Sequence, residues 1–179
     1  DFEKRMSNKL KREESFSYSC EPKIDGIAIC LVYQDGILTR AGTRGDGSTG
    51  EEVTHNVKTM KGIPLQLKKS KNFAYPKEIE IRGEIYVEKK DFSNLNDKFK
   101  EEGQKVFANP RNFAAGSMRQ LNPKVASSRP LKVFCHSLGY VDEKTFFESQ
   151  SSVIEAFQVW GLPTCPEISV SYTHLRAHE

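Results

Sequence analysis

The chain has 179 residues, of which 37% are hydrophobic and 28% charged, and its formal net charge is +3. This length is enough for one sizeable domain with its own core, and the composition is that of an ordinary soluble protein. No apolar run approaches the roughly 20 residues that span a bilayer, and the first residues lack the apolar core of a signal peptide. We therefore expect a cytoplasmic protein without membrane contact.

The first 15 residues are rich in charge, with Phe2, Met6 and Leu10 at helical spacing. This pattern predicts the end of an amphipathic helix whose beginning is missing. We therefore expect the chain to be a fragment of a longer protein, with residues 1–15 as the remnant of a preceding subdomain.

The main domain is placed at residues 16–170. Residues 171–179 differ in character from what precedes them and resemble a translated cloning-vector junction. This segment holds His174 and His178, which we therefore do not interpret as a metal-binding pair.

The first half of the main domain begins with a predicted hairpin. Two apolar runs between Tyr18 and Arg44 flank Gln34-Asp35-Gly36, and Asp-Gly between strand-like segments is a strong hairpin signal. Residues 43–50 then form a glycine-rich polar loop, followed by a helical or irregular stretch to Met60.

Three further strands are predicted, at Ile63–Leu67, Glu78–Val87 and Leu131–His136. The second has clear alternation of apolar and polar residues, which is typical of a half-buried strand. Gly83 interrupts it and predicts a bulge or the close approach of a ligand.

Helices are expected between these strands. Asp91 is predicted to cap a helix over Phe92–Glu102, and Asn109-Pro110 has the cap and first-turn residues of a second helix. Ser152–Trp160, closed by Gly161, is a third. Hairpin strands with two or three helices predict an α+β fold, a largely antiparallel sheet flanked by helices.

The four cysteines lie within or beside apolar stretches and have no Cys-x-x-Cys spacing; they are Cys20, Cys30, Cys135 and Cys165. This argues against a zinc site or a disulfide framework and predicts reduced core residues.

The segment from Gly103 to Val141 contains no Asp or Glu. Its basic residues are Lys105, Arg111, Arg119, Lys124, Arg129 and Lys132. A phosphate-rich partner would prefer such a segment, although a solvated basic surface is the ordinary alternative.

A cluster of charges precedes the first apolar strand, in Cys20-Glu21-Pro22-Lys23-Ile24-Asp25-Gly26. In an extended chain residues two apart share a face, so Glu21, Lys23 and Asp25 are expected to point the same way. A buried or half-buried ammonium must be paired or become a neutral amine, which is a nucleophile. On this motif alone, a surface ion pair between Lys23 and Asp25 is the simpler interpretation.

Four ordered motifs together resemble the adenylation domain of bacterial NAD-dependent DNA ligases. They are residues 20–26, 43–50, 80–84 and 107–121, and the resemblance runs from Ser19 to Cys165. Lys-x-Asp-Gly alone is shared with ATP-dependent ligases and capping enzymes, whereas four long motifs in this order are specific. The resemblance implies a covalent nucleotidyltransferase fold of the ATP-grasp-like ligase type.

The resemblance also implies a reaction. Lys23 attacks the adenylyl phosphorus of NAD, releases nicotinamide mononucleotide (NMN) and becomes linked to AMP. AMP passes to the 5′-phosphate of a nick in double-stranded DNA, and the 3′-hydroxyl displaces it, in replication and repair. The implied cofactors are NAD and Mg²⁺ or Mn²⁺, and we expect a monomer associated with the bacterial nucleoid. An ordinary lysine is protonated at neutral pH, so neighbouring carboxylates should be engaged elsewhere during the chemistry.

Roles for single residues follow from the resemblance. Glu21 contacts the adenine ring, Glu84 contacts the ribose or a divalent metal, and Asp25 positions Lys23 and its metal environment. Arg44 contacts the nucleotide, and its planar fork suits phosphate or ribose oxygens.

Two further arginines, Arg111 and Arg119, match family residues near the AMP phosphate and the nick. Eight residues separate them by about 80° around a helix, so one helix would direct both into one groove. For Arg82 we expect only a surface ion pair. The glycines of residues 43–50 either cradle a phosphate or only form a loop.

Several parts of the complete enzymes have no counterpart in this sequence. They are most of the NMN-binding subdomain, a second lysine motif, the oligonucleotide-binding fold and a zinc module, so zinc is expected only outside this chain. We therefore expect the chain alone to seal nicks poorly.

Three alternatives stay open. An ATP-dependent ligase or capping nucleotidyltransferase would share Lys23, but residues 109–121 argue against it. A non-catalytic nucleic-acid-binding module is disfavoured by the intact Lys23 and Glu84. A phosphate-binding regulatory domain is a distant third.

Overall fold

The computed structural model describes residues 2–11, 18–45, 49–71, 73–142, 147–167 and 169–171. The chain forms two compact units, one from Asp1–Pro22 with Cys165–Glu179 and the other from Lys23–Thr164. No helix in the described ranges is long and apolar enough to cross a membrane.

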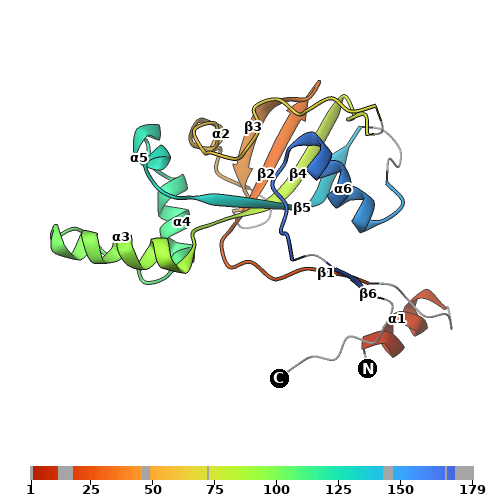
Figure 1. Cartoon of the computed structure of the whole chain (residues 1–179), viewed down its shortest axis with the longest axis horizontal. Coiled ribbons are helices and arrows are strands. Elements are labelled where there is room, and N and C mark those ends of the chain that lie inside the picture. The colour runs from red at the N-terminus through yellow and green to blue at the C-terminus, as the bar shows by residue number, and fades with distance from the viewer. Residues whose placement is uncertain are drawn as a thin grey trace. The chain divides into compact units, whose positions relative to one another are not determined.

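The larger unit is built on a four-stranded antiparallel sheet with the order β3-β2-β4-β5 (Figure 1). Its strands are β2 (Ile27–Gln34), β3 (Ile37–Thr43), β4 (Glu78–Tyr86) and β5 (Lys132–Val141). Every neighbouring pair is antiparallel, which confirms the predicted α+β sheet.

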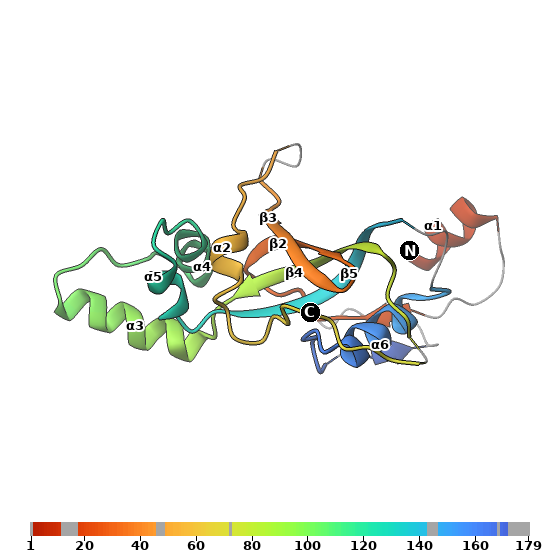
Figure 2. The same cartoon turned by 90° about the horizontal axis from the view of Figure 1, so that it is seen from above.

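The larger unit has five helices in its described residues, and they lie around the sheet. They are α2 (Thr54–Val57), α3 (Lys89–Glu101), α4 (Pro110–Met118), α5 (Pro123–Ser127) and α6 (Gln150–Trp160). Both views show α3, α4 and α5 together at one end of the sheet (Figures 1 and 2). Helix α4 packs on β2 and β4, α2 on β3, and α6 on β5.

The two faces of the sheet have different chemistry because side chains alternate along each strand. One face is the core, and its side chains Ile29, Leu31, Tyr33, Ile79, Ile81 and Ile85 are at most 1% exposed. On the other face, Cys30 lies opposite Arg82 and Ala28 lies opposite Glu84. The polar residues of β4 are therefore left available for a site.

The predicted hairpin is confirmed by β2 and β3. Asp35 and Gly36 form its turn with φ values of 49° and 77°, the left-handed conformation that two-residue hairpin turns require. A Cβ on Gly36 would lie 2.6 Å from the Tyr75 ring, so glycine is also needed for space.

The predicted strand at Ile63–Leu67 is wrong. The segment makes a single bridge from Gln66 to Ile37 and is otherwise irregular. Pro64 has no N–H to donate, so a continuous ladder cannot form along this edge. Ile63 and Leu67 are nevertheless buried, which explains the apolar pattern.

The predicted irregularity at Gly83 is confirmed. The register between β4 and β5 shifts between Arg82 and Gly83. A Cβ on Gly83 would lie 2.6 Å from the Phe134 carbonyl oxygen, so the two backbones approach closely here. Strand β5 is longer than predicted, because it continues past His136 to Val141.

Two helix caps match their signals. The Asn109 side chain accepts a hydrogen bond of 2.7 Å from the Asn112 N–H, which confirms the predicted start of α4. Gly161 ends α6 with φ of 86°, as predicted, although α6 begins two residues earlier than expected, after the Ser149 cap.

Two other helix predictions need correction. Helix α3 begins at Lys89 after Glu88, so Asp91 lies in its first turn and is not the cap. Helix α5 was not predicted, although Asn122-Pro123 repeats the Asn-Pro signal of α4 and the Asn122 side chain accepts from the Lys124 N–H at 3.0 Å.

The smaller unit contains α1 (Phe2–Leu10) and a pair of short antiparallel strands, β1 (Tyr18–Cys20) and β6 (Ser169–Ser171). Helix α1 confirms the helix predicted from the spacing of Phe2, Met6 and Leu10. Strand β6 was not predicted. Residues 172–179, with both tail histidines, lie outside the described residues.

An aromatic cluster joins α3 and α4, and Arg129, which follows α5, packs on it. The Phe113 ring contacts the rings of Phe92, Phe99 and Phe107 at centroid distances of 5.2–6.5 Å. The Arg129 guanidinium lies 5.1 Å from the Phe113 centroid. It also donates to the Ser117 hydroxyl at 2.7 Å, and burial lowers its pKa.

The acid-free segment is therefore only partly a free basic surface. Arg129 is stacked on aromatic rings, and Lys132 pairs with Glu88 from outside the segment. Of the six basic residues, Lys105 and Lys124 are exposed and form no ion pair within the described part of the chain.

We expect Arg129→Lys to lower the free energy of unfolding by about 1–2 kcal/mol, because a lysine loses the planar stacking and the hydrogen bond to Ser117. Urea denaturation measures this change. Lys124→Ala on the exposed side of α5 is the control and should stay within about 0.5 kcal/mol. Equal losses in both variants would show that the Arg129 stack is not structural.

Candidate functional site

A cavity of about 980 Å³ opens on the polar face of the sheet. Three predicted site residues line it: Lys23, Arg44 and Glu84. They come from three of the four sequence motifs, which are far apart in the chain, so the fold brings these motifs to one place.

Lys23 lies in an irregular segment before β2, which begins only at Ile27. Its side chain is exposed, so the alternative of a buried or half-buried ammonium does not apply, and the carboxylate expected to pair with it, Asp25, pairs with Arg111. The alternation expected for residues 21–25 does not apply either, because this segment is not a strand. The amine is instead accessible from solvent at the edge of the cavity.

Gly26 fixes this segment against the sheet. A Cβ on Gly26 would lie 2.1 Å from the Ile85 carbonyl oxygen and 3.1 Å from Cγ of Glu84. Only glycine allows the backbone to approach the end of β4 this closely. The contact places the Lys-x-Asp-Gly segment beside the strand that carries Glu84.

Asp25 does not line the cavity and points instead toward Arg111, with 3.8 Å between its Oδ1 and the Arg111 Nη1. Both side chains are more than half exposed, at 73% and 62%. Such a pair contributes at most about 1 kcal/mol. The carboxylate of the Lys-x-Asp-Gly motif therefore pairs with Arg111.

Arg119 lies just after α4, which ends at Met118, so the prediction of one helix carrying both arginines is wrong in its last residue. The Arg119 Nε lies 2.7 Å from Oε2 of Glu51. Arg111 and Arg119 therefore meet different carboxylates, and neither lines the cavity itself.

Glu21 belongs to the smaller unit, in the segment that follows β1, and is half-buried. Its contact with an adenine ring stays a prediction.

A second polar group in the cavity was not recognised in the sequence. Glu80 Oε1 pairs with the Arg82 Nε at 3.1 Å and accepts a hydrogen bond of 3.3 Å from the Cys30 thiol. Burial, together with Glu80, raises the pKa of Cys30. The predicted ion pair of Arg82 is confirmed. Residues 80, 82 and 84 alternate with core residues along the strand, and this alternation could have predicted that Glu80 and Arg82 face the cavity together with Glu84.

Comparison with known proteins identifies the family. The chain matches the model of the NAD-dependent DNA ligase adenylation domain over residues 1–176. The chain belongs to this family. It is also 44% identical over 169 residues to a DNA ligase of Coxiella burnetii (strain Dugway 5J108-111). The aligned residues make up 94% of this chain and 25% of that protein.

The chain therefore spans about a quarter of the length of this relative. Family membership confirms the resemblance seen in the sequence motifs, and the mixed helix and antiparallel sheet structure agrees with an adenylation domain.

The residues present fit a magnesium ion only together with a nucleotide. Within the described ranges, no group of three or more His, Cys, Asp or Glu side chains could hold a metal ion. Mg²⁺ is commonly bound by one or two carboxylates plus substrate phosphates. Glu84, half-buried in the cavity, offers such oxygens, whereas Asp25 lies outside the cavity and pairs with Arg111.

The cysteines offer no zinc site in this adenylation domain. All four are free, and Cys135 and Cys165 are buried. Burial raises the pKa of Cys135 to about 12, so this thiol stays protonated.

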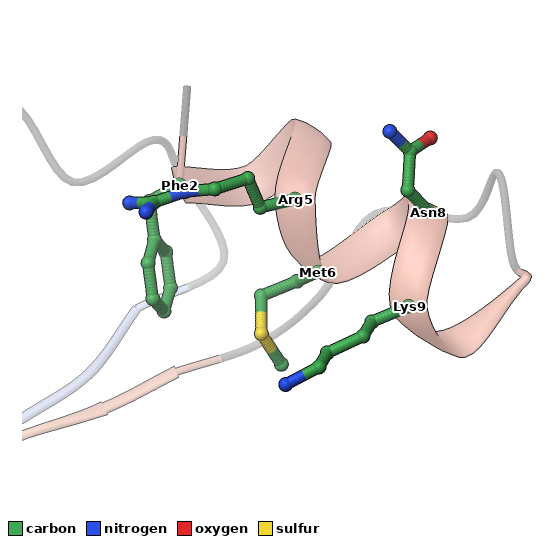
Figure 3. Close-up of a pocket in the computed structure, with 5 residues that line it drawn as sticks. All are labelled: Phe2, Arg5, Met6, Asn8 and Lys9. Carbon is green, nitrogen blue, oxygen red and sulfur yellow. The ribbon is translucent and has the colours of Figure 1, made fainter.

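A second hollow, of about 570 Å³, lies along α1 in the smaller unit (Figure 3). Phe2 and Met6 project from one side of the helix, with Asn8 on the opposite side. The hollow is mainly apolar and is lined by one helix, so it offers no arrangement of catalytic groups.

Gly26→Ala should lower the free energy of unfolding of the adenylation domain by about 1–3 kcal/mol, since the added methyl group would meet backbone at the end of β4. Thermal or urea denaturation measures the loss. Gly42→Ala, whose Cβ would have only an ordinary contact of 3.6 Å, is the matched control. If Gly26→Ala is no less stable than Gly42→Ala, the close approach does not exist in solution.

Proposed function

We propose that this domain performs the first step of DNA ligation, the transfer of AMP from NAD to Lys23. The Lys23 amine attacks the adenylyl phosphorus, a P–N bond forms, and the P–O bond to NMN breaks. The amine proton goes to solvent, and NAD is consumed. The observation that carries this proposal is the meeting of Lys23, Arg44 and Glu84 in one cavity of an adenylation domain.

The cavity suits a nucleotide in size and chemistry. Its volume of about 980 Å³ lies at the upper end of ligand pockets, which are commonly about 300–1,000 Å³. Arg44 offers a planar fork for phosphate or ribose oxygens, and Glu84 offers acceptors for ribose hydroxyls. Glu84 would hold Mg²⁺ or Mn²⁺ together with the substrate phosphates, and the ion would supply positive charge to the diphosphate; Asp25 would join it on leaving Arg111.

The arrangement also supports the nucleophilic role of the lysine. Only the neutral amine attacks, and at pH 7.4 about one ordinary lysine in a thousand is neutral. A salt bridge to the neighbouring carboxylate would hold the ammonium form, but Asp25 is paired with Arg111. Lys23 is exposed at the edge of the cavity and so can reach a bound dinucleotide.

The later steps act on DNA. We propose that AMP passes from Lys23 to the 5′-phosphate of a nick and that the 3′-hydroxyl then displaces it, in bacterial replication and repair. Arg111, Arg119 and the exposed Lys105 and Lys124 would contact phosphates, which gives affinity without sequence preference. Because the chain spans 25% of its relative, we propose that efficient sealing needs further segments and that the chain alone seals weakly.

Intact-mass analysis after incubation with NAD and Mg²⁺ tests the first step. We expect the chain to gain one AMP, and Lys23→Ala to gain none because the nucleophile is gone. Lys90→Ala removes an exposed lysine of α3 and should still be adenylated. The same measurements belong on a chimera in which this chain replaces the matched 169-residue segment of the C. burnetii ligase.

Each other outcome has a clear meaning. A gain from ATP and not from NAD would favour the ATP-dependent relatives. A gain in the chimera alone would show that the proposed chemistry needs the additional segments. No gain in either protein would contradict the proposal and favour a non-catalytic nucleic-acid-binding module.

A further inference from the structure

Helix α2 (Thr54–Val57) holds the backbone on both sides of Arg119. The Asn56 side-chain N–H₂ donates to the carbonyl oxygens of Met118 and Gln120, each at 2.8 Å. These two carbonyls flank Arg119 in the chain. A single amide therefore fixes the turn by which the chain leaves α4.

Asn56 is a buried polar residue, 5% exposed, and only the N–H₂ group of its side chain forms hydrogen bonds among the described residues. Both amide hydrogens are engaged, whereas Oδ1 is buried and has no hydrogen-bond partner among the described residues. Leaving a buried acceptor unpaired is unfavourable. An apolar residue would avoid that cost, but it could not hold the two carbonyls.

Glu51, from the segment between β3 and α2, holds the Arg119 side chain. Its Oε2 lies 2.7 Å from the Arg119 Nε, and both side chains are more than half exposed, at 54% and 64%. A screened pair of this kind adds little stability. It occupies Nε alone, so the two Nη groups keep the edge that binds a phosphate in bidentate geometry.

Glu51 is itself fixed to the edge of the nucleotide cavity. The Thr43 N–H donates to the Glu51 carbonyl at 2.9 Å, and the Glu51 N–H donates to the Thr43 hydroxyl at 3.1 Å. Thr43 ends β3, lines the cavity and precedes Arg44. The position of Arg119 is thereby tied to the end of the strand that leads into Arg44, the proposed nucleotide contact.

We propose that Asn56 and Glu51 are positioning residues that direct the free edge of Arg119 to a phosphate of the nicked DNA. Asn56 sets the backbone and Glu51 sets the side chain. The proposal rests on the proposed function, in which Arg119 contacts the nick. Neither residue touches the reacting atoms, so both act through Arg119.

A double-mutant cycle in the chimera tests the proposal. The substrate is nicked DNA whose 5′-phosphate already carries AMP, so its sealing needs no NAD and separates DNA positioning from lysine adenylation. We expect Asn56→Ala to slow sealing by about 10- to 100-fold, the range that a small misplacement costs. Glu51→Gln should slow it less, by about tenfold or under, because the backbone clamp remains.

The deciding variants combine each change with Arg119→Ala. If both residues act through Arg119, the double variants seal no more slowly than Arg119→Ala alone. If the losses multiply, Asn56 and Glu51 act independently of Arg119 and the proposal is wrong. Glu51→Gln keeps this test valid should Asn56→Ala fail to fold.

Two controls separate positioning from stability. Val153→Ala removes buried volume in α6 and should lower the melting temperature without slowing sealing. Glu102→Gln removes an exposed ion pair, with Lys98, of the same kind as Glu51 and Arg119. Slow sealing in either control would contradict a specific role for the Arg119 contacts.

A different measurement, the gain of AMP from NAD, tests the proposed function itself. If the unmodified chimera gains no AMP from NAD, the adenylation proposal fails. If it is adenylated and seals nicks but the cycle shows independent losses, only the positioning proposal fails.

Discussion

The rest of the structure depends on one constraint, the alternation of core and cavity side chains along β4. Two close backbone contacts hold this strand in place. Ile79, Ile81 and Ile85 enter the core, so the polar residues between them must face the cavity. Gly83 allows β5 to approach on one side, and Gly26 allows the Lys-x-Asp-Gly segment to approach at the end of the strand. A shift of one residue along this strand would exchange core and site, since it reverses every side chain.

Basic residues of this domain pair with acidic residues that lie far from them in the sequence. The acid-free segment predicts a basic surface, yet Arg111, Arg119 and Lys132 meet Asp25, Glu51 and Glu88, which come from other parts of the chain. Arg129 needs no carboxylate, because aromatic faces and a hydroxyl surround its guanidinium. A linear charge pattern therefore overestimates the surface that is free to bind phosphate.

Much of the architecture could be predicted from local signals. Asp35-Gly36, Asn109-Pro110 and Gly161 act within a few residues, through turn conformation or capping, and each has the predicted role. The failures depend on tertiary contacts. Lys23 is exposed because its segment stays irregular until Gly26 meets β4, and no local pattern specifies that contact. Asn56 gave no signal at all, because its two acceptors lie more than 60 residues away.

The two exposed ion pairs beside the site agree with the proposed binding of phosphates by Arg111 and Arg119. Asp25 and Glu51 keep Arg111 and Arg119 oriented, but pairs of this exposure contribute only about 0–1 kcal/mol. A phosphate would therefore replace Asp25 at Arg111 at little cost, whereas at Arg119 it would add to the free Nη edge while Glu51 stays on Nε. The backbone around Arg119 is held differently, by the buried amide of Asn56. A held backbone and a held Nε would let Arg119 bind a phosphate without refolding its surroundings, whereas Arg111 would first release Asp25.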